Sequence, residues 1–210
     1  MRKIDDNLFD VLGLEDDEKK SFQSTYETLE TNFNLSYEQD FKFRFKAFSV
    51  FKDLNNISIR DTFKITRQDS FSYLTFTSVD YSLIGGRTGR VNGSSYQIWG
   101  IAYLKRNYGC ILIQPETLFL KLTELIEPIE IDINEDKEFS RKFYVLASDN
   151  KLALDFLSKG VRENILDLKD NEFYIEVKDN LLIIGNRKNV SPKYGLKIGQ
   201  FIEKISTMNI

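Results

Sequence analysis

A long run of β-type sequence between Ile57 and Ile113 constrains this chain of 210 residues more than any other feature. Branched and aromatic residues dominate the run and are broken only by short polar interruptions, which is typical of consecutive strands. Parallel strands need a crossover of about a dozen residues, whereas antiparallel strands need only a tight turn. Because no helical stretch of that length interrupts the run, it predicts an antiparallel β-meander.

Glycine-bearing turns are expected within this meander. Gly85-Gly86 marks one turn, and Asn92-Gly93 lies between two β-like runs. Asn-Gly is the strongest short hairpin signal, because both central residues of a type I′ turn have positive φ. We therefore predict a hairpin with Asn92-Gly93 at its tip and no helix after it.

Helical periods flank the meander on both sides. Apolar residues at spacings of three and four predict helices over 15–33, 118–126, 152–168 with an interruption at Gly160, and 193–205. Further strands are expected at 129–133 and 143–147 and in a hairpin over 173–184. Strands and helices are grouped rather than strictly alternating, which favours an α+β fold. We expect antiparallel β-meander sheets packed by an N-terminal helix, a mid-chain helix pair and a C-terminal helix.

The domain organisation is expected to be simple. The sequence contains no internal repeat, low-complexity tract or Pro/Ser-rich linker, so we predict a single α+β domain over 1–210. A sub-boundary near 53–57 would separate an N-terminal helix and strand, 1–56, from a β-rich body, 57–210.

The segment that joins the first helix to the meander alternates phenylalanine with basic residues. Phe41, Phe43 and Phe45 recur with the period of two expected of a half-buried strand, which would place the intervening side chains on one outer face. Those intervening residues are Lys42, Arg44 and Lys46. A helix would also gather Phe41, Phe45 and Phe48, but the alternation favours a strand. We expect the basic face to be solvated, with contact to an anionic surface as the alternative.

The absence of histidine excludes several classes of chemistry. The Ser-His-Asp and Cys-His arrangements, His-containing metal sites and imidazole pH switches all need that side chain. A single cysteine, Cys110, excludes disulfides within the chain and thiolate metal clusters, and its apolar neighbours predict a buried thiol. No cofactor fingerprint is present, so neither a cofactor nor a metal ion is expected.

Two polar features remain as candidate sites. Arg87 and Arg90 lie in the glycine-rich stretch 85–93, where backbone N–H groups and guanidinium groups could hold a phosphate. The stretch lacks the Walker spacing, so a pair of β-turns with solvated arginines is the favoured interpretation. Asp149, at the end of a predicted strand, is expected to be a helix N-cap rather than an acid or a metal ligand.

One segment resembles a known family. The stretch from Phe139 through Phe143 and Val145 to Ser148-Asp149, with the helix and hairpin that follow, resembles a family of uncharacterised bacterial proteins. In that family a strand of the form F-x-V-x-S-D leads into a helix A-x-x-x-L, a short helix and a β-hairpin. The resemblance implies no catalytic residues. Many members carry apolar N-terminal segments that suggest membrane tethering, and this chain departs from them there.

These observations favour a non-catalytic binding or interaction domain, with phenylalanine and tyrosine beyond the needs of a core as a surface for a protein partner. The alternatives are a carboxylate-based enzyme and a peripheral binder of anionic lipid or phosphate. A net charge of -3 makes nucleic acid an unlikely partner. With no signal peptide or transmembrane segment in the sequence, we expect a cytoplasmic protein, and peripheral membrane association stays open.

Overall fold

The structure is a computed structural model that describes residues 13–52, 54–85, 89–115, 128–133, 135–169, 172–208 and 210, with only the backbone for 82–85 and 89–92. Its strands are β1 (Leu35–Tyr37), β2 (Asn56–Arg67), β3 (Ser70–Gly85), β4 (Gly89–Tyr103), β5 (Cys110–Pro115), β6 (Ile129–Glu130), β7 (Phe143–Ala147), β8 (Tyr174–Lys178) and β9 (Leu181–Gly185). Its α-helices are α1 (Asp16–Asn32), α2 (Lys137–Lys142), α3 (Asn150–Phe156), α4 (Lys159–Leu166) and α5 (Pro192–Thr207).

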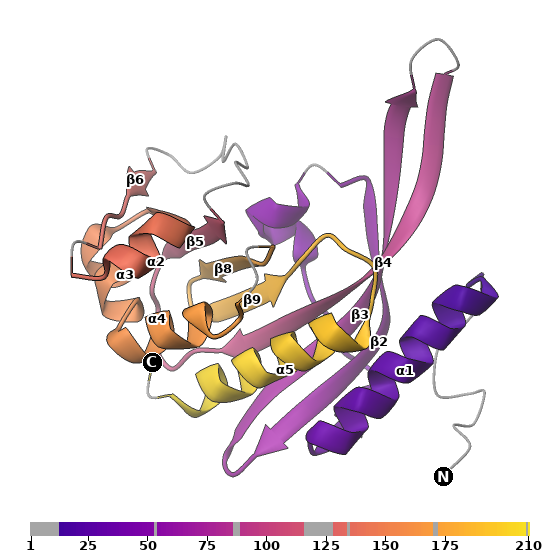
Figure 1. The fold of residues 1–210 in the computed structure, drawn as a ribbon, viewed down its shortest axis with the longest axis horizontal. Coiled ribbons are helices and arrows are strands. Elements are labelled where there is room, and N and C mark those ends of the chain that lie inside the picture. Colours follow the sequence, from indigo (N-terminus) through magenta and orange to yellow (C-terminus); the bar gives the residue numbers. More distant parts are fainter. Residues whose placement is uncertain are drawn as a thin grey trace.

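The strands form one nine-stranded sheet in the order β1-β2-β3-β4-β9-β8-β5-β7-β6, and every neighbouring pair is antiparallel. Helices α1 and α5 lie side by side across one face of this sheet, and α2, α3 and α4 gather at one side of the molecule (Figure 1). The predicted α+β class is therefore confirmed, with an N-terminal helix, a mid-chain pair of helices and a C-terminal helix packed on antiparallel strands.

The predicted turn at Asn92-Gly93 is wrong. β3 and β4 do form a hairpin, but the chain reverses between the paired residues Gly85 and Gly89. Asn92 lies opposite Ser82 inside the strand pair, and Gly93 lies opposite Tyr81. The Asn-Gly signal fails because cross-strand pairing continues through it. Beyond Asp80, where the pairing with β2 ends, β3 continues with β4 alone as a two-stranded arm (Figure 1).

The predicted strand over Phe41, Phe43 and Phe45 is also wrong. Residues 41–44 are irregular, and two short 3₁₀ helices follow, η1 (Phe45–Ala47) and η2 (Ser49–Phe51). The alternation still matches burial, since the basic residues are exposed and the phenylalanines are buried or half-buried. Irregular backbone can reproduce this pattern when a chain crosses an apolar surface, so the period of two was not evidence of strand pairing.

Most of the other predicted elements are confirmed. Helices occur near the expected positions at the N-terminus, over 150–166 and at the C-terminus, and the strand at 143–147 and the hairpin over 173–184 are present. The interruption predicted at Gly160 lies instead at Leu157 and Ser158, between α3 and α4, and Gly160 belongs to α4. The strand expected at 129–133 is shorter, since β6 covers only two residues. The helix predicted over 118–126 lies outside the described residues.

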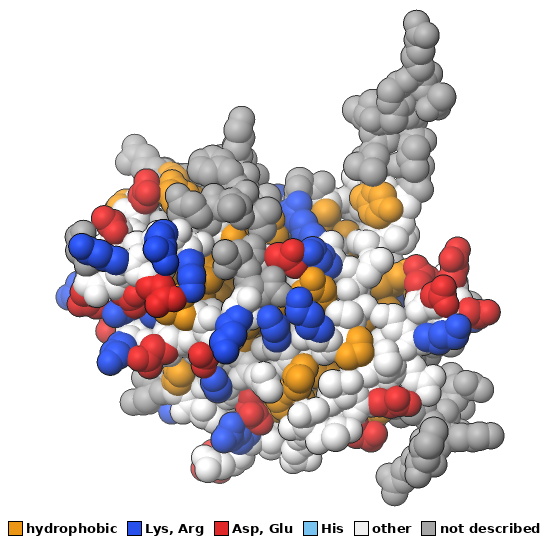
Figure 2. Space-filling view, in the orientation of Figure 1, with side chains coloured by type: hydrophobic (Ala, Val, Ile, Leu, Met, Phe, Trp, Pro, Cys, Tyr) orange, Lys and Arg blue, Asp and Glu red, His pale blue; other side chains and the backbone are white. Residues whose placement is uncertain are grey.

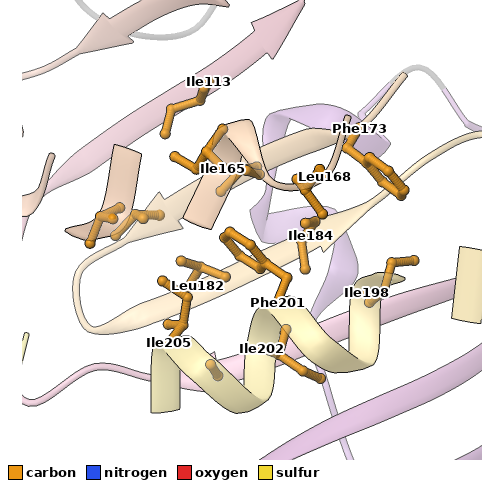
Figure 3. Packing of buried hydrophobic residues seen from close by; sticks show 14 of the residues in the cluster. Ile113, Ile165, Leu168, Phe173, Leu182, Ile184, Ile198, Phe201, Ile202 and Ile205 are labelled. Atoms are coloured by element: carbon orange, nitrogen blue, oxygen red, sulfur yellow. The ribbon is translucent and has the colours of Figure 1, made fainter. Parts of the chain in front are cut away.

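The larger core lies between the sheet and its helices. Side chains on one side of α5 point toward strands β8 and β9, where Phe201 and Ile205 approach Leu182 and Ile184 (Figure 3). All four of these side chains are at most 1% exposed. Apolar burial of this kind contributes roughly 25 cal/mol per Å², so this helix is a main source of the stability of the fold.

Small residues set how closely α5 approaches its neighbours. A Cβ atom on Gly100 of β4 would lie 2.6 Å from Ile198 and 2.7 Å from Ile202, both on α5. A Cβ atom on Gly195 or Gly199 of α5 would likewise meet α1 or the residue after it, at Thr25 or Phe33. These contacts require glycine because no larger residue leaves room for the observed spacing.

The opposite face of the sheet is covered by an N-terminal stretch. Residues 41–52 and 54, which we call the covering segment, pack their phenylalanines onto this face and form a second core with Trp99. The ring centroids of Phe51 and Trp99 are 4.4 Å apart, and Trp99 is fully buried. Gly185 lies opposite Trp99 on β9, where a Cβ atom would come within 2.4 Å of the indole ring. The sheet is thus enclosed on both faces in its centre.

We predict that Gly100→Ala lowers the free energy of unfolding by about 1–3 kcal/mol, because the added methyl group displaces α5 from the sheet. Gly160→Ala is the matched control, since a Cβ atom there meets nothing within 4 Å. It should stabilise the protein by up to about 1 kcal/mol through helix propensity. Urea denaturation of both variants measures the two effects. Equal midpoints would show that α5 can shift without cost.

Candidate binding surface on the sheet

The covering segment leaves open a row of side chains at the margin of the sheet face that it covers, opposite α1 and α5. The row crosses the neighbouring strands β3, β4, β9, β8 and β5. Its members, in that order, are Phe71, Tyr103, Leu181, Lys178 and Cys110. Alternate side chains of a strand point to opposite faces, and neighbouring strands place paired residues side by side. The row therefore follows from strand register, which relates residues far apart in the sequence.

Two aromatic rings in this row are exposed to solvent. Phe71 is 41% exposed and Tyr103 is 45% exposed, and their ring centroids are 6.3 Å apart. Tyr73, in the next row, lies 5.7 Å from Phe71 and 6.3 Å from Tyr103. Phe41 of the covering segment packs 4.7 Å from Tyr73. We call these four rings the aromatic surface. Single exposed apolar side chains are common on proteins, whereas a contiguous group marks a contact site.

Charged groups of both signs border the aromatic surface. The Lys64 ammonium lies 4.5 Å from the centre of the Phe71 ring, and Lys64 is the cross-strand neighbour of Tyr73. Burial raises the pKa of Tyr73, and the nearby Glu38 carboxylate and Tyr103 raise it further. Neither Lys64 nor Glu38 forms an ion pair within the described part of the chain. Both side chains are half-buried at the border of the aromatic surface.

Charges on the helical face are arranged differently. Figure 2 shows basic and acidic side chains interspersed there, with acidic ones gathered where α1 begins. Several of the cations are paired, such as Lys204 with Asp167 at 3.0 Å and Arg67 with Glu203 at 2.8 Å. Lys64 and Glu38, at the border of the aromatic surface, differ from these because they form no ion pair with a residue that the structure describes.

A buried carboxylate fixes the covering segment to the sheet. Glu176 on β8 accepts hydrogen bonds from the Ser49 backbone N–H at 2.9 Å, the Ser49 hydroxyl at 2.7 Å and the Val50 N–H at 3.1 Å. Burial raises the pKa of Glu176 despite these three donors and the nearby Lys178. Lys178 and Arg187 add bonds to the carbonyl oxygens of Ala47 and Val50, at 3.0 and 2.7 Å. This clamp holds the edge of the covering segment beside the open row.

The basic residues predicted to form one strand face have separate environments. Lys46 donates to the carbonyl oxygens of Phe51 and Leu54 and so closes the short helical turns. Lys42 and Arg44 are exposed on the irregular stretch before η1. The geometry of a strand does not align these three side chains, because no strand exists there. Of the anion-binding candidates, Arg87 lies outside the described residues, and only the backbone of Arg90 is described.

The other polar candidates have structural roles. Asp149 is the N-cap of α3 and accepts a hydrogen bond from Leu152 N–H at 2.8 Å, as predicted. Cys110, expected to be buried, is partly exposed, and burial of its remaining surface raises the pKa of its thiol. Within the described ranges, no group of three or more acidic or cysteine side chains is placed to hold a metal ion. No helix among those residues is both long and apolar enough to cross a bilayer.

A pocket of about 170 Å³ lies elsewhere, between the start of α1 and the loop before α5. Phe22, Tyr96 and Val190 contribute its apolar wall, and Asp17 and Glu18 lie at its acidic side. The buried carboxylate of Glu176 is not among its lining residues. The pocket therefore does not bring a shifted carboxylate to a cavity, which a carboxylate-based enzyme would need.

The aromatic surface was missed from the sequence, although its signal was present. Abundant phenylalanine and tyrosine predicted a partner surface without identifying its residues. Phe71 and Tyr103 belong to different strands and come together only through register. No sequence period relates the covering segment to the rows it covers.

Comparisons with known proteins give little. No protein-family model and no curated protein matches the chain. Among solved structures, the mycobacterial trehalose monomycolate transport factor A, TtfA, aligns with 90% of this chain and 97% of its own. The TM-score is 0.46 and the sequence identity 7%. A likeness of this degree does not establish a shared fold.

We predict that Glu176→Gln changes how stability depends on pH. A raised pKa means that the folded state binds the proton more tightly than the unfolded chain, so this group's contribution is lost as pH rises through the folded pKa. Glutamine cannot accept all three hydrogen bonds, so the variant should be about 1–2 kcal/mol less stable at low pH. The deficit should shrink between about pH 4 and pH 8.

Urea denaturation of both proteins across this range measures the deficit, and titrations common to both cancel. A deficit that stays constant or grows with pH would show that burial does not control this carboxylate.

Proposed function

We propose that this protein is a non-catalytic binding domain that holds a partner protein against the aromatic surface. The observation that carries the proposal is the exposure of Phe71 and Tyr103 as neighbours, 41% and 45%, beside two further rings. Burying such rings against a partner stabilises a complex, and aromatic residues are enriched where interfaces derive most of their affinity.

The arrangement of the rings favours a protein over a nucleic acid. The plane of Tyr73 is inclined by 73° to that of Phe71 and by 76° to that of Tyr103, so the three rings pack edge to face. Successive bases stack on ring faces that are free of other rings. The hydroxyl groups of Tyr73 and Tyr103 have no hydrogen-bond partner among the described residues, which suits the polar backbone of a protein partner.

Rigidity beneath the surface also supports a binding role. Leu74, one residue along β3 from Tyr73, is fully buried against the helical layer, and the Glu176 clamp fixes the covering segment that carries Phe41. A surface held in one arrangement loses little conformational entropy when a partner binds. The carboxylate-based enzyme has weaker support, since the three hydrogen bonds to Glu176 account for that group as a structural one.

The test is a peptide-display selection against the purified protein, followed by affinity measurement on the selected peptides. We expect the double variant Phe71→Ser, Tyr103→Ser to lose at least about tenfold in affinity, because each removed ring contributes roughly 1 kcal/mol or more. Leu154→Ser is the matched control, since Leu154 is 45% exposed on α3, outside the aromatic surface.

Circular dichroism checks that both variants stay folded. Peptides that bind the double variant as tightly as the original protein would refute the proposal, and so would a selection that enriches no peptide.

A further inference from the structure

We propose that the outer edge of β4, where this strand forms the two-stranded arm with β3, binds an extended segment of a partner protein as an added strand. The pocket at the base of this edge takes a lysine or arginine side chain of the same segment. This site is separate from the aromatic surface, which lies toward the other end of the β3–β4 pair, at Phe71 and Tyr103. It therefore does not depend on the proposed function.

The outer edge of β4 has no neighbouring strand over much of its length. β4 pairs with β9 from Trp99 to Tyr103, and no described strand pairs with this edge between Gly89 and Ile98. The arm extends away from the body of the molecule (Figure 1). The N–H and C=O groups of such an edge can bond the main chain of another extended segment.

Two hydrogen bonds show which backbone groups of β4 point outward. The Val190 N–H donates to the Tyr96 carbonyl oxygen at 2.7 Å, and the Leu104 N–H donates to the Asn180 carbonyl oxygen at 2.8 Å. Both bonds lie on the side of β9, since Asn180 and Val190 precede and follow that strand. Alternate residues of an antiparallel strand direct their N–H and C=O groups to the same side. The residues before Tyr96 that direct these groups to the open edge are Arg90, Asn92 and Ser94.

The arm lacks the features that usually prevent strand addition. Residues 81–85 of β3 pair with 89–93 of β4 in continuous register, without a bulge. In these two stretches only Arg90 is charged, and none of the residues is proline. Exposed edges are usually protected by lysine, proline or bulges. A two-stranded ribbon is only marginally stable by itself, so a third strand stabilises the arm.

A pocket lies where this open edge ends. Tyr96 and Val190, whose hydrogen bond follows the open stretch, both line the pocket of about 170 Å³ between α1 and the loop before α5. The Ser21 hydroxyl of α1 donates to the Val190 carbonyl oxygen and so fixes this loop. A strand that is added beside Ser94 and continues toward Val190 brings one of its side chains to the pocket.

The pocket suits a long side chain with an apolar stem and a positive end. Its apolar wall is formed by Phe22, Tyr96 and Val190, and its acidic side by Asp17 and Glu18. Acidic side chains gather at this end of α1 (Figure 2). Lysine and arginine pack their methylene groups on apolar surface while the charge stays in water.

Both carboxylates keep the capacity to accept a further donor. Asp17 lies 3.3 Å from the Lys20 ammonium in an exposed ion pair, and Glu18 accepts a hydrogen bond from the Glu15 N–H at 2.8 Å. A carboxylate has about four acceptor positions, so these contacts leave others for a partner's cation.

The test selects short peptides from a random display library against the full chain carrying Phe71→Ser and Tyr103→Ser, so that the aromatic surface does not contribute. We expect the enriched peptides to contain a lysine or arginine. Asn92→Pro removes an outward N–H of β4 and should weaken their binding at least about fivefold. Ser82→Pro is the matched control, because Ser82 lies opposite Asn92 on the outer edge of β3, and it should leave the affinity unchanged.

The acidic side of the pocket is tested with the same peptides. The double variant Asp17→Asn, Glu18→Gln should weaken binding about threefold, because an exposed ion pair contributes little. A peptide with norleucine in place of its basic residue should bind this variant and its parent equally, since it has no charge to lose.

Amide hydrogen exchange locates the bound peptide even where a proline variant unfolds. Exchange should slow at Asn92 and Ser94 and stay unchanged at Ser82. This pattern, together with weaker binding to Asn92→Pro, supports the proposal. A selection that enriches no peptide overturns it, as do peptides that bind without protecting β4. Peptides that add to β4 without a basic residue overturn the assignment of the pocket. The proposed function is decided separately, since its peptides need Phe71 and Tyr103.

Discussion

The close approach of α5 to the sheet is the constraint on which the rest of the structure depends. It is possible because Gly100 leaves room for two isoleucines of the helix, while Gly195 and Gly199 let α1 lie against the same helix. A larger residue at any of these points would separate layers that share one core. With α1 and α5 seated, one face of the central strands is fully covered, and any binding role of their faces falls to the other one.

The covering segment closes only part of the sheet face opposite α1 and α5. Polar contacts as well as apolar packing hold the segment in place there. Within the covering segment the backbone forms only the i→i+3 hydrogen bonds of its short 3₁₀ turns, so other backbone groups need donors and acceptors from the sheet. Glu176, Lys178 and Arg187 supply them. A buried carboxylate is costly unless it is hydrogen-bonded, and its three donors all belong to the covering segment. The clamp therefore determines where the cover ends and where the row with Phe71 and Tyr103 begins.

The aromatic surface combines a rigid base with unsatisfied groups, and this combination links the fold to binding. Its rings contact one another, which limits their motion, and the strands beneath them are buried on the helical side. Lys64, which packs on the Phe71 ring, and Glu38 add charges of both signs at its border. A surface of this kind gains from association by burying rings and pairing charges, with little reorganisation.

The sequence by itself determined the α+β class, the helices at both termini, the presence of a helix pair over 150–166 and the capping role of Asp149. These depend on local periodicity and on side chain to backbone hydrogen bonds within a few residues. Only the tertiary structure decided that Asn92-Gly93 lies within a strand pair, that the Phe41–Phe45 stretch is a cover rather than a strand, and that Phe71 meets Tyr103. The physical reason is that strand register and the packing of a segment across a sheet depend on contacts between distant residues, which no local pattern encodes.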